Sequence, residues 1–214
     1  MTSNGWLQIA IFGVIVIAIT QPLGGYMTRV FAGERTLLSP LLRPIERLVY
    51  WCCGVDESEE QSWRSYAMAM VLFGAAGFVM LYALQRLQSY LPLNPQRQPG
   101  VDPVLAFNIS LSFVTNTNWQ SCVPETTMGY LVQMAGLTGQ NFLSAAGGIA
   151  LALALIRGFA RREASGIGNF WVDLTRCTLY ILLPISVIGG LFLVWQGVPQ
   201  DSERLRRCDD VGGR

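Results

Sequence analysis

Four long stretches of this 214-residue chain contain no charged residue, and they constrain its fold more than any other feature. They span residues 6–23, 66–84, 126–156 and 177–195. A helix needs about 20 apolar residues to cross a hydrocarbon layer of about 30 Å. Because the backbone must also satisfy its own hydrogen bonds in that layer, we expect an all-α integral membrane protein with four transmembrane helices.

The composition argues against most enzyme chemistries. Charged residues make up only 14% of the chain, histidine is absent, and all 15 basic residues are arginine. A chain without histidine lacks the commonest general base and metal ligand, and one without lysine cannot build a P-loop. The 14 acidic residues nearly balance the basic ones, so nothing indicates a nucleic-acid partner. We therefore expect no catalytic residues and no ATP binding in this chain.

The arginines predict the orientation in the membrane. The stretch 27–65 holds five arginines and 157–176 holds four, whereas 85–125 holds two and the first five residues hold none. Because cytoplasmic loops carry the excess of arginine, we expect the first two stretches in the cytoplasm and the N-terminus outside. The predicted segments are a first transmembrane helix at 1–28, a cytoplasmic amphipathic linker at 29–65, a helix–pore loop–helix repeat at 66–156, a cytoplasmic turn at 157–176, a fourth transmembrane helix at 177–196 and a charged tail at 197–214.

The cytoplasmic linker contains a helical pattern of its own. Apolar residues recur at helical spacing, and polar ones lie opposite: Leu41, Ile45, Leu48, Val49 and Cys52 against Arg43, Glu46, Arg47 and Tyr50. This pattern predicts an amphipathic helix that lies on the membrane or against a partner, with Pro44 in its first turn. The acidic run at 56–60 that follows is predicted to be a solvated face.

One apolar segment is too short to span a membrane. After the helix-starting pair Asp102-Pro103, residues 104–114 are apolar but extend only about 16 Å as a helix, about half a bilayer. The polar residues 115–120 follow directly. Two interpretations remain open: a re-entrant half-helix followed by a pore loop, or an amphipathic surface helix followed by an outer loop.

The pore-loop interpretation implies a cation. The C-terminal end of a helix carries partial negative charge from its unpaired carbonyl groups, and an extended stretch beyond it can present further carbonyls in place of a cation's water shell. No charged residue lies between Asp102 and Glu125. A neutral carbonyl site favours a monovalent cation, because a divalent one would require carboxylates.

Several segments resemble KdpA, the potassium-binding and translocating subunit of the Kdp potassium-transporting ATPase. SFVTNTNWQS at 112–121 resembles the first pore-loop segment of that family, and LTGQNFLSAA at 137–146 resembles its third helix. Further similarity lies in PLGGYMTRVF, EEQSWRSYA, YLPLNPQ and GNFWVDLTR, so that the resemblance runs from about residue 5 to about residue 196.

The resemblance implies a potassium-channel-like fold in which four pore-loop repeats surround one filter. It also implies a bacterial plasma (inner) membrane location and ATP-driven uptake of K⁺ from outside, with the P-type ATPase subunit KdpB and the subunits KdpC and KdpF as partners. By match, backbone carbonyls that coordinate K⁺ would come from Thr115, Asn116, Thr117, Asn118 and Gln120. No glycine lies between Gly100 and Gly129, so we expect Asn116 or Asn118 to supply the positive φ that filter loops need.

The chain also departs from the family. It contains one pore repeat and one further span, and the charged segment from residue 200 onward does not resemble the family. We interpret the chain as the N-terminal part of such a subunit, a truncated or frameshifted product. The alternative is a non-transporting small membrane protein, or a non-functional product, that only packs against partner helices.

Overall fold

The computed structural model describes residues 3–119, 121–160 and 166–198, and every regular element in these ranges is a helix. The α-helices are α1 (Ser3–Phe31), α2 (Ser39–Cys53), α3 (Trp63–Leu87), α4 (Pro103–Val114), α5 (Pro124–Thr127), α6 (Gly139–Ala160), α7 (Phe170–Arg176) and α8 (Leu183–Trp195). The 3₁₀ turn η1 (Gln88–Tyr90) follows α3, and the π-helical segments η2 (Val132–Thr138) and η3 (Cys177–Leu182) lead into α6 and α8.

Four helical stretches are long and apolar enough to cross a membrane, which confirms the expected number. They are Asn4–Phe31, Trp63–Tyr90, Val132–Ala160 and Phe170–Trp195. The fourth begins seven residues before the apolar run at 177–195. Asp173 and Arg176, which precede that run, lie within the helix and are both paired with opposite charges.

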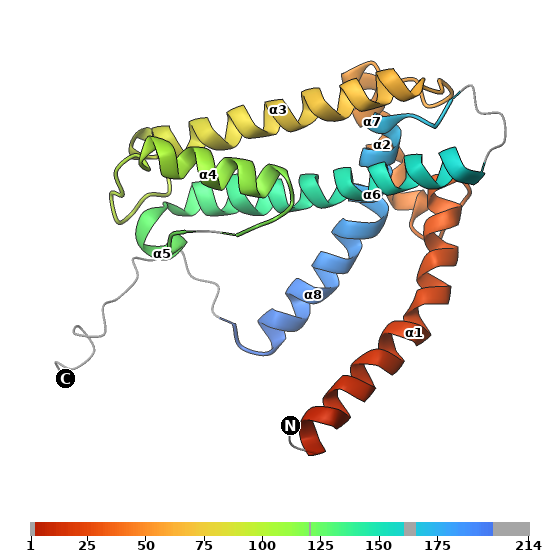
Figure 1. Cartoon of the computed structure of the whole chain (residues 1–214), viewed down its shortest axis with the longest axis horizontal. Coiled ribbons are helices and arrows are strands. Elements are labelled where there is room, and N and C mark those ends of the chain that lie inside the picture. Colours follow the sequence, from red (N-terminus) through yellow and green to blue (C-terminus); the bar gives the residue numbers. More distant parts are fainter. Residues whose placement is uncertain (1–2, 120, 161–165, 199–214) are drawn as a thin grey trace.

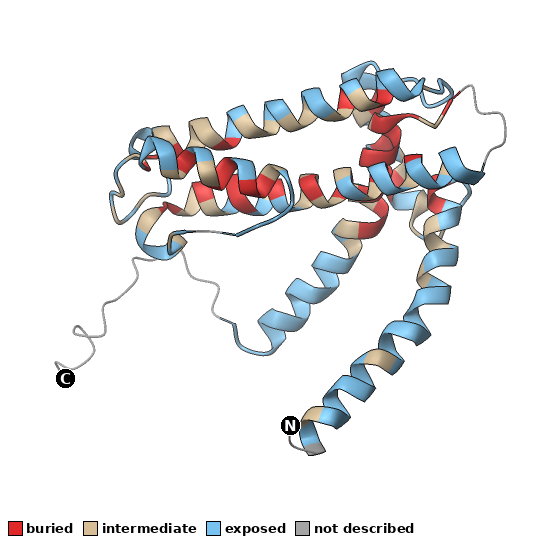
Figure 2. Ribbon diagram, viewed as in Figure 1, coloured by how far each residue is buried: buried red, intermediate tan, exposed pale blue. Residues whose placement is uncertain are grey.

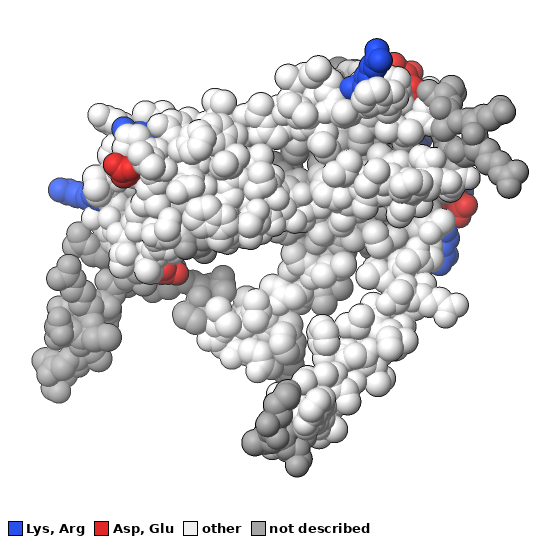
Figure 3. Space-filling model, viewed as in Figure 1, with Lys and Arg blue, Asp and Glu red and all other residues white. Residues whose placement is uncertain are grey.

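The helices form a compact group from which two helices diverge. α3 and α6 run alongside each other with α4 beside them at one end, whereas α1 and α8 point away from this group (Figure 1). Buried residues concentrate in α4, α6 and α7, and α1 and α8 are largely exposed (Figure 2). Charged side chains lie toward the ends of the α3–α6 group, and the surface between them is uncharged (Figure 3). An uncharged band of this kind suits a hydrocarbon environment.

One core cluster joins α3, α6 and α7. Tyr66 and Phe170 are buried at its centre with their rings edge to face, 5.5 Å apart. The buried residues that α6 contributes to this cluster are Ala146, Ala150 and Ala154, spaced four apart and therefore on one face. Small side chains on that face allow the neighbouring helices to approach closely, as transmembrane helices require.

A buried ion pair fastens the start of α7 to the end of α6. The two terminal guanidinium nitrogens of Arg157, Nη1 and Nη2, donate to the carboxylate of Asp173 at 2.6 and 2.9 Å. The hydroxyl of Tyr66, on α3, lies 3.1 Å from the same carboxylate. The Asp173 side chain is only 2% exposed, so its charge depends on Arg157 rather than on water.

A second buried carboxylate fastens α2 to the bundle. Glu46 is 1% exposed and accepts hydrogen bonds from Arg176 Nε at 3.0 Å, Tyr180 at 2.8 Å and Tyr50 at 2.9 Å. Burial by itself raises the pKa of the Glu46 carboxyl, but these hydrogen bonds outweigh burial and the net pKa lies below its ordinary value. Glu46 therefore stays ionised at neutral pH.

The structure corrects three expectations for this region. Glu46 and Tyr50, on the predicted polar face of α2, pack inward, because the partners of Glu46 lie on η3 and the end of α7. Pro44 lies in the second turn of α2 rather than the first, because the helix begins at Ser39 and takes Pro40 into its first turn. The acidic run is exposed as expected, but Glu57 is more than a solvated charge, since it pairs with Arg43 and Arg176.

Replacing Asp173 with alanine should destabilise the fold by about 3 kcal/mol or more, because it leaves Arg157 buried without its counter-charge. The double variant Arg157→Met, Asp173→Leu should recover most of that loss, since it removes both charges together. Thermal unfolding of the detergent-solubilised protein measures the effect. A double variant less stable than either single variant would show that the pair itself contributes the stability.

The Glu46 carboxylate should also make stability depend on pH. Its pKa is lowered in the folded protein, so its contribution is complete above the ordinary glutamate pKa of about 4.3 and is lost as pH falls from there through the lowered value. We expect the unfolding midpoint to drop across this range, and Glu46→Gln to reduce the drop while lowering stability at pH 7. An unchanged pH profile in Glu46→Gln would contradict this role.

Candidate functional site

The short helix predicted after Gly100 forms as expected. The side chain of Asp102 caps α4 by accepting hydrogen bonds from the backbone of Val104 at 2.9 Å and Leu105 at 3.2 Å, and Pro103 occupies the first turn. The 12 residues of α4 extend about 18 Å, about half the length of α3 beside it.

Burial holds α4 against the two long helices. Ala106, Ile109 and Phe113 pack with residues of α3 and η2 in a second core cluster. Gln85, fully buried on α3, donates from Nε2 to the hydroxyl of Ser110 on α4 at 2.9 Å. This bond is one of the few polar links between α3 and α4, and it fixes the rotation of α4 about its axis.

The chain enters and leaves this half-length helix at the same end of the α3–α6 pair. Gln88, at the end of α3 and 1% exposed, donates to the carbonyls of Pro99 and Thr127 and accepts from the backbone N–H of Gly129. One side chain thus joins the connection before α4 to the connection after it. Tyr130 N donates to Leu93 O at 2.9 Å and adds a second link.

The polar segment begins with a helix-ending motif. Thr117 N donates to Ser112 O at 3.0 Å, and Asn116 N donates to Phe113 O at 3.3 Å, with Asn116 at φ 56°. These two bonds and the left-handed residue make a Schellman motif. They correct the expectation of a helix end with unpaired carbonyls, because Ser112 and Phe113 are capped.

Asparagine takes the backbone conformation for which filter loops often use glycine. Asn116 and Asn118 have φ values of 56° and 57°, so both adopt the left-handed conformation that the sequence led us to expect of one or the other. Asparagine tolerates this region far better than branched residues do. A left-handed residue at every second position turns the backbone sharply, so 115–119 forms a compact turn held by Ser112 Oγ donating to Trp119 O at 2.7 Å.

The free acceptors therefore lie beyond the helix. Within the part of the chain that the structure describes, no hydrogen bond is accepted by the carbonyl oxygens of Thr115, Asn116, Thr117 or Asn118. Their side chains bond to one another instead: the two threonine hydroxyls lie 3.0 Å apart, and Asn118 Nδ2 donates to Asn116 Oδ1 at 3.3 Å. All four residues are exposed, whereas Gln120, the fifth predicted ligand, lies outside the described residues.

The turn lies near the middle of the neighbouring spans. Ser144 on α6 donates to Asn116 Oδ1 at 3.3 Å, and it stands 12 residues after the start and 16 before the end of the span Val132–Ala160. On α3, a Cβ at Gly74 would lie 3.6 Å from Val114, also near mid-span. A polar turn at this depth is allowed where it lines a cavity or is buried in protein.

Sequence reasoning found the turn but missed the residues that position it. The four residues are Ser112, Ser144, Gln85 and Gln88. Ser112 and Ser144 lie in the family-like segments 112–121 and 137–146, but nothing in the sequence assigned a hydrogen-bond partner to any of the four. Their polarity within a span was the only available signal, since such residues seldom go without a hydrogen-bond partner.

A family model matches residues 10–213 of the chain, and its description is KdpA, potassium-transporting ATPase A subunit. The chain belongs to this family. Together with the four membrane-capable helices, this makes it a multi-pass membrane protein. The match to the family model reaches residue 213, whereas the curated relatives align over 200 residues. That residues 197–214 form a charged tail unlike the family therefore stays a prediction.

Curated relatives named potassium-transporting ATPase potassium-binding subunit are similar along almost the whole chain. Identity is 62% to the protein of Bradyrhizobium diazoefficiens, 64% to that of Methylobacterium radiotolerans and 60% to that of Rhodopseudomonas palustris. Each alignment covers 94% of this chain and 35% of the relative. This chain therefore spans about a third of the length of the relatives it matches.

The left-handed conformation at Asn116 gives a test of the turn. Asn116→Gly should leave stability nearly unchanged, because glycine adopts positive φ without strain. Asn116→Val should lower the free energy of unfolding by about 2 kcal/mol, because a branched residue is strained there. Both variants lose the hydrogen bond from Ser144, so the difference between their free energies of unfolding reports the backbone strain alone. Equal unfolding midpoints for the two variants would contradict the observed turn.

Proposed function

We propose that this chain contributes one potassium-binding pore loop to a KdpA subunit, the part of an ATP-driven uptake complex that takes up K⁺ from the outer side. The observation that carries the proposal is the turn at mid-span whose carbonyl oxygens of Thr115, Asn116, Thr117 and Asn118 accept no hydrogen bond within the described residues. Carbonyl groups that lack partners in an apolar layer are the groups that replace a cation's hydration shell.

The electrostatics favour a monovalent ion. No charged residue lies between Asp102 and Glu125, so the turn offers neutral oxygens rather than the carboxylates that a divalent ion prefers. The relatives are named as potassium-binding, which makes K⁺ the ion of choice. In this proposal Gln120 adds a ligand carbonyl just beyond the turn.

One turn is only part of a coordination shell. The exposure of Thr115–Asn118 on one side fits a site completed by further loops, and the relatives are almost three times as long as this chain. Four such turns around one axis would form a potassium-channel-like filter. This chain alone would leave a dehydrated K⁺ with too few ligands.

The proposed topology makes α4 a re-entrant half-helix. Its two connections meet at Gln88, at the end of the bundle opposite the arginine-rich segments. Because arginine marks the cytoplasmic side, α4 enters from outside and the N-terminus is also outside, in a bacterial inner membrane. The match to a subunit of a potassium-transporting ATPase supports KdpB as the ATP-hydrolysing partner in this proposal. We propose that KdpC and KdpF complete the complex, and we expect no ATP binding by this chain itself.

Substitution of Asn118 in the full-length subunit, assembled with its partners, tests the proposal. Asn118→Val forces the backbone out of the left-handed region and should raise the KM for K⁺ uptake at least tenfold, whereas Asn118→Gly keeps positive φ and should raise it much less. Transport of ⁸⁶Rb⁺ or K⁺ into proteoliposomes gives KM and kcat separately.

The matched pair separates the two interpretations of the sequence. An equal KM in both variants and the wild type, with intact assembly, would refute the filter and favour a non-transporting protein that packs against partner helices. Assembly is checked by co-purification of the partner subunits, so that a loss of folding is not read as a loss of affinity.

A further inference from the structure

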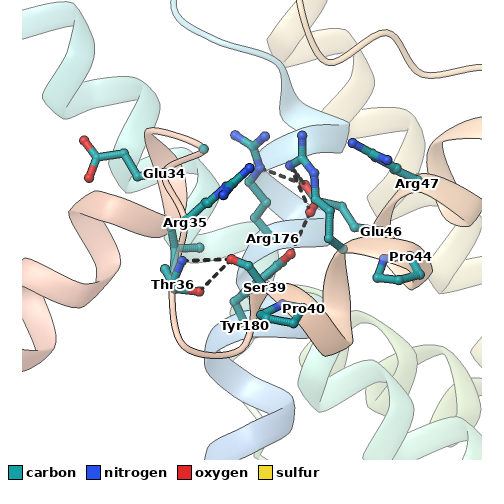
Figure 4. Close-up of a pocket in the computed structure, with 13 residues that line it drawn as sticks. Glu34, Arg35, Thr36, Ser39, Pro40, Pro44, Glu46, Arg47, Arg176 and Tyr180 are labelled. Atoms are coloured by element: carbon teal, nitrogen blue, oxygen red, sulfur yellow. Dashed lines mark hydrogen bonds and ion pairs between the residues drawn. The ribbon is translucent and has the colours of Figure 1, made fainter.

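A cleft unrelated to the turn lies where α1, α2 and η3 meet. It has a volume of about 770 Å³, and its lining includes the guanidinium groups of Arg35, Arg43, Arg47 and Arg176. Figure 4 shows the side chains of Arg35, Arg47 and Arg176 directed toward one another, with Glu34 pointing away. The same cleft is lined by one buried carboxylate, that of Glu46, which is bonded to Arg43 and Arg176.

Two of the four arginines have no counter-charge. Arg43 and Arg176 are bonded to Glu46 and Glu57. Arg35 and Arg47 are exposed, and within the described ranges no ion pair or hydrogen bond involves their guanidinium groups. The mouth of the cleft therefore carries uncompensated positive charge, and a guanidinium is the side chain best suited to bind a phosphate through two parallel hydrogen bonds.

The opposite side of α2 carries exposed apolar residues. Arg43 and Arg47 are four residues apart and share one face of the helix, next to Glu46, which bonds to Arg43 and is buried against the bundle. Leu41 and Leu48, 71% and 58% exposed, lie on the other side of the helix and outside the cleft lining. A helix with arginines on one side and exposed leucines on the other is the arrangement of interfacial membrane helices.

The cleft also lies at the appropriate end of the molecule. It is formed by the C-terminal end of α1 and by α2, in the arginine-rich stretch that the positive-inside rule assigns to the cytoplasm. The cytoplasmic leaflet is the one that carries anionic phospholipids, and it attracts basic segments at its surface.

We propose that this cleft binds the phosphate headgroup of an anionic phospholipid from the cytoplasmic leaflet. Arg35 and Arg47 hold the phosphate, and the acyl chains lie along Leu41 and Leu48. The exposed leucines favour a lipid over a soluble phosphate compound, which has nothing to place against them. We favour a lipid over an acidic peptide because α2 follows the membrane-capable helix α1 after a short connection. The proposal is independent of the potassium site.

Lipid retention by the full chain in detergent tests this assignment. Native mass spectrometry with added phosphatidylglycerol should show a bound lipid in the wild type, and Arg35→Gln with Arg47→Gln should weaken its binding about 30-fold, from the usual contribution of each arginine at a membrane surface. The matched control is Arg64→Gln, which removes an exposed arginine that lies over Trp63, outside this cleft. It should bind like the wild type.

Three further measurements decide the source of the phosphate and exclude misfolding. Phosphatidylcholine should bind at least tenfold more weakly, and millimolar inorganic phosphate should not displace the lipid. The double variant should keep the wild-type unfolding midpoint, because neither guanidinium makes a hydrogen bond or ion pair within the described residues. Equal binding of both lipids, displacement by inorganic phosphate, or undiminished binding by the double variant would each overturn the proposal.

Discussion

The structure depends on one constraint: backbone N–H and C=O groups in an apolar layer must find partners within the protein. Four long helices meet this requirement internally, and α4 meets it by an aspartate cap at one end and a Schellman motif at the other. Against this background the turn at 115–119 is exceptional, because four consecutive carbonyl oxygens accept nothing from the described residues. Such a segment is stable at membrane depth only if something else supplies the partner, and an ion that has lost its water is one such partner.

The second organising feature is the pairing of charge at the end of the bundle opposite α5. Glu46 and Asp173 are almost fully buried, and each is matched by an arginine from a distant part of the chain. Breaking such a pair costs more than replacing it with apolar residues, so these carboxylates fix how the elements assemble. Through them α2 and α7 are joined to the bundle. In the proposed lipid site, Arg35 and Arg47, which take no part in this pairing, bind at the membrane surface.

Large apolar surfaces are exposed in this chain, which matches only about a third of the length of its relatives. α1 and α8 expose apolar side chains along most of their length (Figure 2), and residues 115–119 are exposed. The 200 aligned residues are 35% of each relative, so most of a relative's chain lies outside the part that matches this protein. In the proposed function that additional chain supplies the remaining loops of the filter, and lipid covers the outer faces of the helices.

The sequence by itself determined the features that depend on neighbouring residues. Four uncharged runs specify four helices, Asp102-Pro103 starts a helix of half-bilayer length, and Asn116 and Asn118 provide positive φ without glycine, because each follows from local dihedral preference or apolar length. Only the tertiary structure decided that Glu46 is buried rather than solvated, that Gln88 joins both connections of α4, and that Asn116 meets Ser144 at mid-span. These contacts join residues 11 to 134 positions apart, and a polar side chain carries no local mark of the partner that folding will place beside it.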